Sequence, residues 1–190
     1  MVDPSPLIPI DQGRSARANA LERVSAHAPF LAMLAGQRAD LTDIFVDKGT
    51  SAALSQCTSL PLAGEAGAAD VMAMLRRRRA DLALVLALAD LSGEHGLTET
   101  VHALSDFADE ACEAALVAAF AERAPGEPVA GFSVIALGKL GSRELNYSSD
   151  IDPILLFDPE TLPRRRSDDA GEAAVRLARR WSEILAARTG

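Results

Sequence analysis

One short stretch, residues 131–158, constrains the fold more than any other part of this 190-residue chain. It reads GFSVIALGKLGSRELNYSSDIDPILLFD and contains two apolar runs, residues 132–137 and 151–157, separated by a polar segment that includes glycines. Short apolar runs bounded by turn residues are typical of buried strands. The stretch therefore predicts a strand, a glycine turn, a short helical or irregular segment and a second strand.

Two carboxylates, Asp150 and Asp152, lie at the entrance of the predicted second strand. Side chains at positions i and i+2 of a strand point to the same face, so we expect these carboxylates to lie side by side. Like charges held that close repel each other unless a cation lies between them. Because oxygen ligands suit Mg²⁺, Asp150 and Asp152 are our candidate catalytic residues and magnesium ligands.

The glycine turn before the carboxylates has the composition of a phosphate-binding loop. Gly138 and Gly141 allow the backbone to approach a phosphate with exposed amides, and Lys139 adds a cation at the same turn. We assign Ser149 to the same nucleotide- and phosphate-binding set. The turn has neither the Walker spacing nor the dinucleotide-binding spacing, so alone it indicates little. Together with the D-x-D pair it predicts metal-dependent nucleotidyl transfer.

Residues 138–152, GKLGSRELNYSSDID, resemble the signature of the glutamine synthetase adenylyltransferase/adenylyl-removing enzyme family. This family is a branch of the polymerase-beta-like nucleotidyltransferase superfamily, and the likeness extends less specifically over residues 16–187. It implies an α+β fold with a lead-in over residues 1–15 and a helical N-terminal subdomain over residues 16–125. Residues 126–190 would then form the first part of the nucleotidyltransferase sheet.

The resemblance also implies an activity and partners. The activity is Mg²⁺-dependent regulation of glutamine synthetase by removal or addition of AMP on a tyrosine, with adenine nucleotide and phosphate as small-molecule ligands. Because the motif follows a helical lead-in, it resembles the N-terminal copy in the family, which removes AMP by phosphorolysis. Control by a PII signal protein is a further implication.

Two features depart from the family pattern. Pro153 follows Asp152 where the family often has an ordinary apolar residue, and we expect a local distortion because proline removes one ladder amide. The superfamily uses a third carboxylate on a neighbouring strand, which in this family lies beyond the end of this sequence. Asp158 should lie at the wrong end of the second strand, and Asp168 and Asp169 resemble helix-start residues. We therefore expect this chain alone to be inactive.

Two other functions are compatible with parts of the sequence. In the first, the helices before Pro125 form a non-catalytic module that binds glutamine synthetase or a PII protein, and the D-x-D pair is retained without chemistry. In the second, the chain modifies a small molecule, which the ELNYSSDID segment fits poorly. Release of AMP or ADP from adenylylated glutamine synthetase would separate the enzyme from the module.

Outside this stretch the hydrophobic pattern is mainly helical. Residues 16–47 predict two or three short helices interrupted at Pro29 and Gly36, and residues 48–67 predict a loop containing one helical turn. Long helices are expected over residues 68–91 and from an N-cap at Thr98 to about residue 123. A last helix follows the start signal at residues 167–169 and uses Trp181 as a core anchor.

Charge and cysteine usage exclude several classes of protein. A net charge of −8 argues against binding to a nucleic-acid backbone. The longest uninterrupted apolar run, residues 82–89, is far shorter than the roughly 20 residues needed to span a bilayer. Cys57 and Cys112 are widely separated, which predicts two structural thiols in a reducing compartment. We expect a cytoplasmic protein that binds neither nucleic acid nor membrane.

For two arginine runs and three histidines we prefer structural or solvent-exposed roles over roles in ligand binding. The four arginines at residues 76–79 spread around a helix, which favours solvated or ion-paired roles over contact with a partner or phosphate. The three at residues 164–166 fit a solvated loop better than a phosphate site. His27, His95 and His102 lack the spacing of a metal site, so we expect structural or surface roles.

Overall fold

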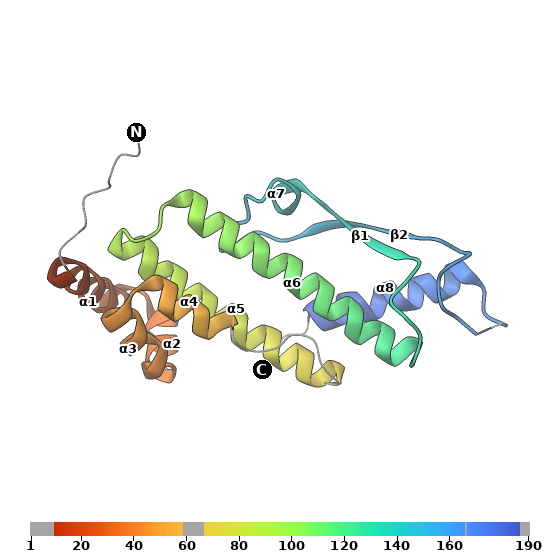
Figure 1. Ribbon diagram of the computed structural model, residues 1–190, viewed down its shortest axis with the longest axis horizontal. Coiled ribbons are helices and arrows are strands. Elements are labelled where there is room, and N and C mark those ends of the chain that lie inside the picture. The colour runs from red at the N-terminus through yellow and green to blue at the C-terminus, as the bar shows by residue number, and fades with distance from the viewer. Residues whose placement is uncertain (1–9, 59–66, 166, 187–190) are drawn as a thin grey trace. The chain divides into compact units, whose positions relative to one another are not determined.

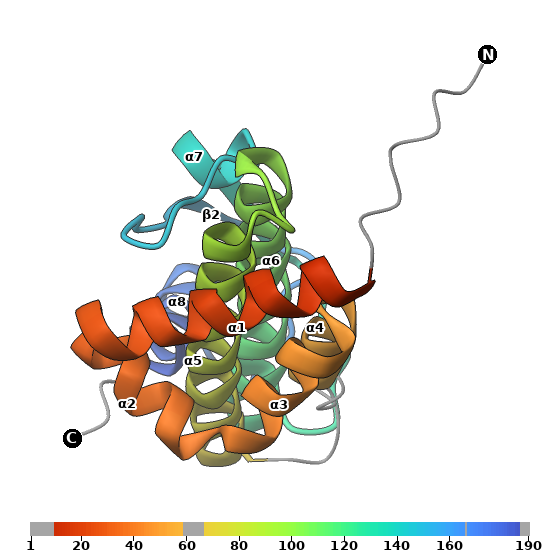
Figure 2. The ribbon, with the colours of Figure 1, turned by 90° about the vertical axis from the view of Figure 1, so that its left-hand side faces the viewer.

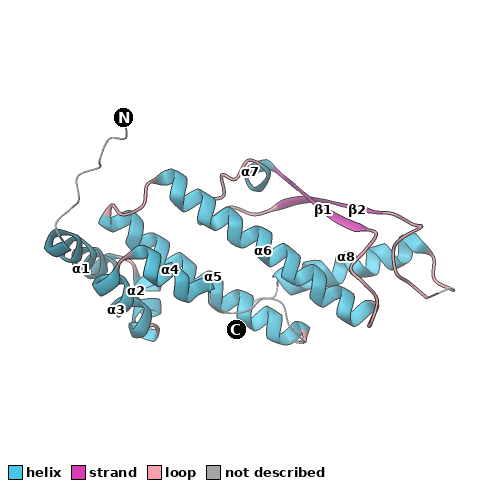
Figure 3. Cartoon of the chain, viewed as in Figure 1, coloured by secondary structure: helices cyan, strands magenta, loops and turns pink. Residues whose placement is uncertain are grey.

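The computed structural model describes residues 10–58, 67–165 and 167–186 (Figure 1). Helices dominate it, and its two strands form one antiparallel sheet (Figure 3). The elements in order are α1 (Ile10–His27), α2 (Pro29–Gln37), α3 (Ala39–Lys48), α4 (Thr50–Thr58), α5 (Ala68–Ser92), α6 (Leu97–Arg123), β1 (Phe132–Leu137), α7 (Gly138–Gly141), β2 (Asp152–Phe157) and α8 (Ala170–Ala186). The α+β class expected from the sequence is confirmed.

The described residues belong to two compact units. Unit 1 comprises those within Met1–Leu60 and Arg78–Thr100, and unit 2 those within Pro61–Arg77 and Val101–Gly190. The two long helices α5 and α6 each contribute residues to both units. The expected division into a helical subdomain up to residue 125 and a catalytic part from residue 126 stays a prediction.

Unit 1 contains α1–α4, the second part of α5 and the first turn of α6, and α1–α4 pack around α5 (Figure 2). Each of the helices α1–α5 places apolar side chains in one cluster: Ala20, Val24, Leu34, Ala35, Leu41, Phe45, Ala53, Cys57, Leu84, Val85 and Leu88. Phe45 is completely buried. A second layer of polar contacts ties the helices together, because Glu94 accepts hydrogen bonds from the Thr50 N–H (2.8 Å) and the Arg17 guanidinium (2.7 Å). Partial burial acts to raise the pKa of the Glu94 carboxyl, but these two hydrogen bonds and a third from the Thr50 hydroxyl at 2.6 Å hold it below its ordinary value.

The helix boundaries in unit 1 differ from the expected ones in three places. α1 already begins at Ile10, so only residues 1–9 of the expected lead-in lie outside the described residues. The break after α2 falls at Arg38 and not at Gly36, because one exposed glycine costs a helix only about 1 kcal/mol. α4 is a helix of 9 residues where we expected one turn. Ala53 and Cys57, four positions apart, bury one face of α4 in the core, and such packing stabilises a helix of weak propensity.

Unit 2 is built from α6, α8, the first part of α5 and the inner face of the sheet. α8 begins as predicted, because the Asp169 carboxylate accepts the Glu172 N–H at 3.0 Å and so caps the helix. Trp181 is the predicted core anchor: it is 3% exposed and its indole N–H donates to the Cys112 carbonyl at 3.0 Å. The Arg180 guanidinium of α8 also pairs with the Glu122 carboxylate of α6 at 2.6 Å.

α6 begins earlier than the sequence predicted. The helix starts at Leu97, so Thr98 lies inside the first turn and is not the N-cap. The Glu99 carboxylate accepts the Gly96 N–H at 3.0 Å, and the Thr100 N–H donates to the Gly96 carbonyl. Gly96 therefore holds the capping position, with Glu99 returning a hydrogen bond to it as in a capping box.

The described residues of the two arginine runs and the two thiols can be compared with the settings we preferred. Arg78 is only 4% exposed, whereas Arg77 and Arg79 are exposed, so the first run is not uniformly solvated. In the second run, Arg164 donates to the carbonyls of Pro159 and Leu162 within its own loop and Arg165 is exposed, while Arg166 lies outside the described residues. Both cysteines are free and buried. No helix in the described ranges combines the length and apolarity needed to cross a membrane.

Candidate functional site

The strand, glycine turn, helical segment and strand predicted for residues 131–158 are all present (Figure 1). β1 leads directly into the short helix α7, and a loop over residues 142–151 returns the chain to β2. The strands pair antiparallel, with Leu137 opposite Asp152 and Phe132 opposite Phe157. This register places the end of β1, where the glycine turn begins, beside the start of β2, where the carboxylates lie.

The sheet has one packed face and one exposed face. Phe132, Val134 and Leu155 pack against the core of unit 2. The side chains between them are exposed, including that of Asp152, and both strands show this alternation. Pairing is regular through Pro153, which lies opposite Ala136, so the distortion we expected at this proline is not found in the register. A proline next to the first residue of a strand costs little pairing.

Asp152 and Asp150 are held in different ways. Asp152 is the first residue of β2, whereas Asp150 lies in the irregular segment before it, so the pairing of the strands fixes only one of the two. Ile151, between them, packs against the core, and both carboxylates are exposed. The alternation of exposure thus agrees with carboxylates on one side of the chain, although Asp150 does not lie in a strand.

Asp158 lies at the opposite end of β2, as expected. Its carboxylate accepts hydrogen bonds from the Thr161 hydroxyl at 2.6 Å and the Glu160 N–H at 3.0 Å. These two hydrogen bonds hold the pKa of the Asp158 carboxyl below its ordinary value. Asp158 therefore stabilises the turn after β2 and is separate from the carboxylate pair.

The glycine turn packs against both strands. Gly138 has a φ of 55°, and a Cβ atom added there would lie 3.3 Å from Oδ2 of Asp152. A Cβ on Gly141 would lie 2.7 Å from the Ala136 carbonyl oxygen. The structure thus brings Gly138 and Asp152 into close proximity, and it does so at a backbone conformation that favours glycine. Lys139, between the glycines, is exposed.

Ser149 takes part in a turn with Asn146. Its hydroxyl donates to the Asn146 side-chain oxygen at 2.9 Å and accepts the Asn146 N–H at 3.0 Å. The Ser148 N–H also donates to the Asn146 side-chain oxygen at 3.0 Å. The hydroxyl proton of Ser149 is therefore engaged within the loop, and donation to a phosphate would require it to leave Asn146.

Sequence reasoning missed two contacts between this loop and α6. The Arg143 guanidinium pairs with the Asp106 carboxylate at 2.5 Å, and Arg143 itself has a φ of 59°. The Leu145 N–H donates to the Ser105 hydroxyl at 3.3 Å. The only signal in the sequence was a serine close to the apolar stripe of the predicted helix, and helix periodicity alone does not show its partner.

The carboxylates of Asp150 and Asp152 are the type of ligand that a magnesium site uses, but two of them are fewer than a complete site needs. Carboxylate oxygens suit Mg²⁺, and no other described residue forms an ion pair with Asp150, Asp152 or Lys139. Among the described residues, no group of three or more His, Cys, Asp or Glu side chains could hold a metal ion. Asp150 and Asp152 would therefore supply only part of the roughly six oxygen ligands that Mg²⁺ takes.

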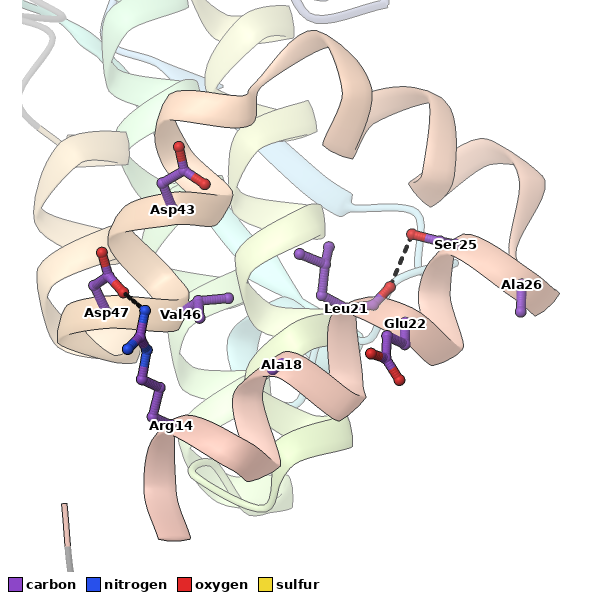
Figure 4. Close-up of a pocket in the computed structure, with 9 residues that line it drawn as sticks. All are labelled: Arg14, Ala18, Leu21, Glu22, Ser25, Ala26, Asp43, Val46 and Asp47. Atoms are coloured by element: carbon purple, nitrogen blue, oxygen red, sulfur yellow. Dashed lines mark hydrogen bonds and ion pairs between the residues drawn. The ribbon is translucent and has the colours of Figure 1, made fainter. Parts of the chain in front are cut away.

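A separate depression lies on unit 1, between α1 and α3 (Figure 4). Its lining is mixed, with the Arg14 guanidinium paired to the Asp47 carboxylate at 2.9 Å. The Ser25 hydroxyl is engaged with the Leu21 carbonyl of its own helix. None of the predicted site residues lines this depression.

Comparison with known proteins assigns the chain to a family. A strand pair that joins a glycine turn to two carboxylates is the arrangement we expected for a nucleotidyltransferase. The family model described as Glutamate-ammonia ligase adenylyltransferase matches residues 18–190, so the chain belongs to this family. The match includes the whole of the segment between Gly138 and Asp152.

Several curated relatives carry the name bifunctional glutamine synthetase adenylyltransferase/adenylyl-removing enzyme. The protein from Rhizobium meliloti (strain 1021) is 41% identical over 133 residues, which cover 64% of this chain and 14% of the relative. The protein from Mesorhizobium japonicum is 35% identical over 193 residues, covering 93% of this chain and 20% of the relative. The chain thus spans a fifth or less of the length of these relatives. No solved structure shows a significant match.

Proposed function

We propose that this chain carries the phosphate-binding turn and two metal-binding carboxylates of a nucleotidyltransferase that regulates glutamine synthetase. The main support for the proposal is the proximity of Gly138 to Oδ2 of Asp152. Both residues lie in the part of the chain that matches the family model. A glycine turn beside a carboxylate can place a phosphate next to a metal ion. Nucleotidyl transfer requires that arrangement.

Each site residue has a proposed role. The exposed carboxylates of Asp150 and Asp152 would hold Mg²⁺, which when bound neutralises charge on the phosphate under attack. The backbone of the turn at Gly138 and Gly141 would bind phosphate oxygens, with the exposed ammonium of Lys139 as an added cation. Ser149 would orient the loop before Asp150 and contribute to nucleotide binding when its hydroxyl leaves Asn146.

The proposed direction is removal of AMP. An oxygen of inorganic phosphate would attack the phosphorus of the AMP–tyrosine ester, and the bond from phosphorus to the tyrosine oxygen would break. The tyrosine oxygen would take up a proton, and the products would be ADP and unmodified glutamine synthetase. Addition of AMP is the alternative direction, since the names of the relatives include both activities.

The partners and location are also proposals. We infer that glutamine synthetase is the protein substrate, because the relatives are named for it. A PII signal protein as regulator follows from the resemblance alone, whereas a cytoplasmic location follows from the two widely separated cysteines and the short apolar runs of the sequence. We further propose that the chain by itself binds the metal weakly and does not turn over, because two carboxylates leave most of the coordination sphere to water.

A metal titration tests the role of the carboxylates. Mn²⁺, a paramagnetic substitute for Mg²⁺, is titrated into the chain and free Mn²⁺ is followed by electron paramagnetic resonance. We expect weak binding that Asp152→Asn reduces by about tenfold or more, because a ligand is lost. Asp158→Asn is the matched control, since it changes an exposed carboxylate at the other end of the same strand. Equal affinities in the two variants would contradict the assignment.

An activity assay tests the reaction. Release of ADP from adenylylated glutamine synthetase is measured with phosphate and Mg²⁺, using the longest polypeptide that contains this chain. We expect release to be lost in Asp150→Asn and Asp152→Asn, and to be absent with residues 1–190 alone. Turnover by residues 1–190 would overturn the proposal that two carboxylates are too few for the reaction. Binding to glutamine synthetase with no turnover, unchanged in Asp150→Asn, would favour the non-catalytic module.

A further inference from the structure

The position of Asp150 depends on the loop between α7 and β2. Asp152 is fixed by its pairing with Leu137, whereas Asp150 has no partner in the strand ladder. A carboxylate that is already held beside its neighbour loses less conformational freedom when a metal ion binds between them, so binding is tighter. The contacts that hold residues 142–149 therefore decide where the carboxylate of Asp150 lies.

The first of these contacts is buried. Ser105, in the middle of α6, is 0% exposed, and its hydroxyl accepts the Leu145 N–H while donating to the Val101 carbonyl at 2.8 Å. Leu145 is itself 4% exposed, so its side chain also anchors the loop. A buried N–H that loses its acceptor is costly, because water cannot replace the hydrogen bond. Ser105 thus fixes the backbone five residues before Asp150.

The second contact is on the surface. Asp106, the next residue of α6, pairs with Arg143 at 2.5 Å, and both side chains are about half exposed, at 54% and 50%. A pair this exposed adds little to global stability, because solvent screens it. Arg143 has a left-handed backbone, which non-glycine residues rarely adopt, so the ion pair holds a residue at a strained turn. The contact is better suited to fixing the path of the loop than to stabilising the fold.

The loop then closes on itself before the carboxylates. Asn146 and Ser149 exchange hydrogen bonds between the N–H of the first and the hydroxyl of the second, and between that hydroxyl and the Asn146 side-chain oxygen. This turn transmits the position of residue 145 to residue 149, one residue before Asp150. A continuous set of contacts therefore leads from α6 to the carboxylate.

We propose that Ser105 and Asp106 are positioning residues for the carboxylate pair, acting through Leu145 and Arg143. The proposal rests on the proposed function, because it assumes that Asp150 and Asp152 bind a metal ion together. Neither residue of α6 is one of the proposed metal ligands, so both would act through the loop. Their effect is to hold the loop so that Asp150 is already beside Asp152 when the metal arrives.

Two measurements on this chain separate positioning from general stability. The variants are Ser105→Ala and Asp106→Asn, and the matched control is Glu122→Gln. Glu122 also lies on α6 and also pairs with an arginine distant in sequence, but its partner Arg180 is on α8 and not in the loop. Backbone amide exchange of residues 143–152 reports on the loop, and Mn²⁺ titration reports on the carboxylates.

We expect a specific pattern. In Ser105→Ala and Asp106→Asn, amides of the loop exchange about tenfold faster, because the local opening becomes easier. The Mn²⁺ dissociation constant rises by up to about tenfold, at the lower end of the range for residues that support metal ligands. Glu122→Gln leaves both quantities unchanged. Exchanging the charges, with Asp106→Arg and Arg143→Asp together, restores Mn²⁺ affinity relative to either single change.

The outcomes that overturn the proposal differ from those that overturn the function. If loop exchange is unchanged in both α6 variants, the anchoring is refuted, whether or not the chain binds Mn²⁺. If exchange rises while Mn²⁺ affinity stays the same, the contacts are structural only, and positioning is refuted. The proposed function fails if the unsubstituted chain binds no Mn²⁺, or if Asp152→Asn binds Mn²⁺ as tightly as the unsubstituted chain does. Positioning of the carboxylate pair then fails as well. The anchoring of the loop to α6 is still judged by amide exchange.

Discussion

Gly141 shows, at the scale of one residue, how tightly the turn of the candidate site is packed. The Ala136 carbonyl oxygen would be 2.7 Å from a Cβ atom at this position, which is closer than real Cβ contacts allow. The obstacle is backbone, so a flexible side chain cannot relieve it. Because Ala136 is in β1 and pairs with Pro153, a shift of Ala136 would also displace β2, the strand that begins with Asp152.

Gly141→Ala should therefore weaken both the fold and the site. We expect a loss of roughly 1–3 kcal/mol in the free energy of unfolding, as for other substitutions that overfill a packed region. Urea unfolding followed by circular dichroism measures it. Gly36→Ala is the control, because Gly36 lies in α2 with nothing within 4 Å of the added atom. That substitution should stabilise the protein by about 0.5–1 kcal/mol, since alanine is the better helix former. Equal effects of the two changes would show that Gly141 is not sterically required.

At the scale of the element, the first turn of α6 is defined by a contact that the residue preferences did not indicate. Thr98 has the chemistry of an N-cap, yet the helix begins one residue earlier. The capping position belongs to Gly96, whose N–H donates to the Glu99 carboxylate. A glycine accepts the non-helical conformation at this position, and a carboxylate in the first turn complements the helix dipole.

The two candidates for the start of α6 can be separated by substitution. Glu99→Ala should lower the free energy of unfolding by about 0.5–1 kcal/mol. The Gly96 N–H would lose its acceptor, and the positive end of the helix dipole would lose the negative charge beside it. Thr98→Ala should change it by less than about 0.5 kcal/mol. Thermal and urea unfolding measure both. A larger loss in Thr98→Ala than in Glu99→Ala would mean that Thr98 is the cap after all.

The elements that were predictable share a strong local signal. The strands of the site and the helices over residues 68–91 and 98–123 have apolar patterns long or regular enough to define them, and only their ends differ from expectation. α4 was missed because its nine residues have weak propensity and are stabilised by the burial of Ala53 and Cys57 in a core that sequence pattern does not show. Tertiary packing decides short helices of this kind.

Some residues of the candidate site were likewise predictable from the local sequence, and others were not. Gly138 and Asp152 were identified from a compact motif, and the structure places them together. Ser105 and Asp106 were not identified, because they lie 40 and 37 residues from their partners in the loop. Contacts at such separations depend on how α6 packs beside the sheet within unit 2. The motif thus predicts the proposed site residues, and the fold determines which contacts hold the loop between them.

At the scale of the whole molecule, the described residues form two hydrophobic cores, each of which contains one thiol. Cys57 lies in the core of unit 1 and Cys112 in that of unit 2. Burial raises the pKa of Cys57 to about 12 and that of Cys112 to about 11, from an ordinary value of 9.0. The folded protein therefore keeps both thiols protonated and unreactive at pH 8. The unfolded chain ionises them near pH 9.0, so their contribution to stability is complete below that pH and is lost as the pH rises toward 11–12.

Because each core has its own thiol, reaction with a thiol reagent can show whether the two units open independently. Phe45→Ala removes a completely buried side chain from the core of unit 1, and Leu177→Ala removes one that is 4% exposed from the core of unit 2. Each should cost about 2–5 kcal/mol. At pH 8 we expect Phe45→Ala to accelerate modification of Cys57 more than that of Cys112. We expect Leu177→Ala to accelerate modification of Cys112 more than that of Cys57. Mass spectrometry identifies which thiol has been modified. The shared helices α5 and α6 argue against complete independence, so some acceleration of the second thiol is expected in each variant. Equal acceleration of both thiols in both variants would instead show that the two cores unfold as one cooperative block.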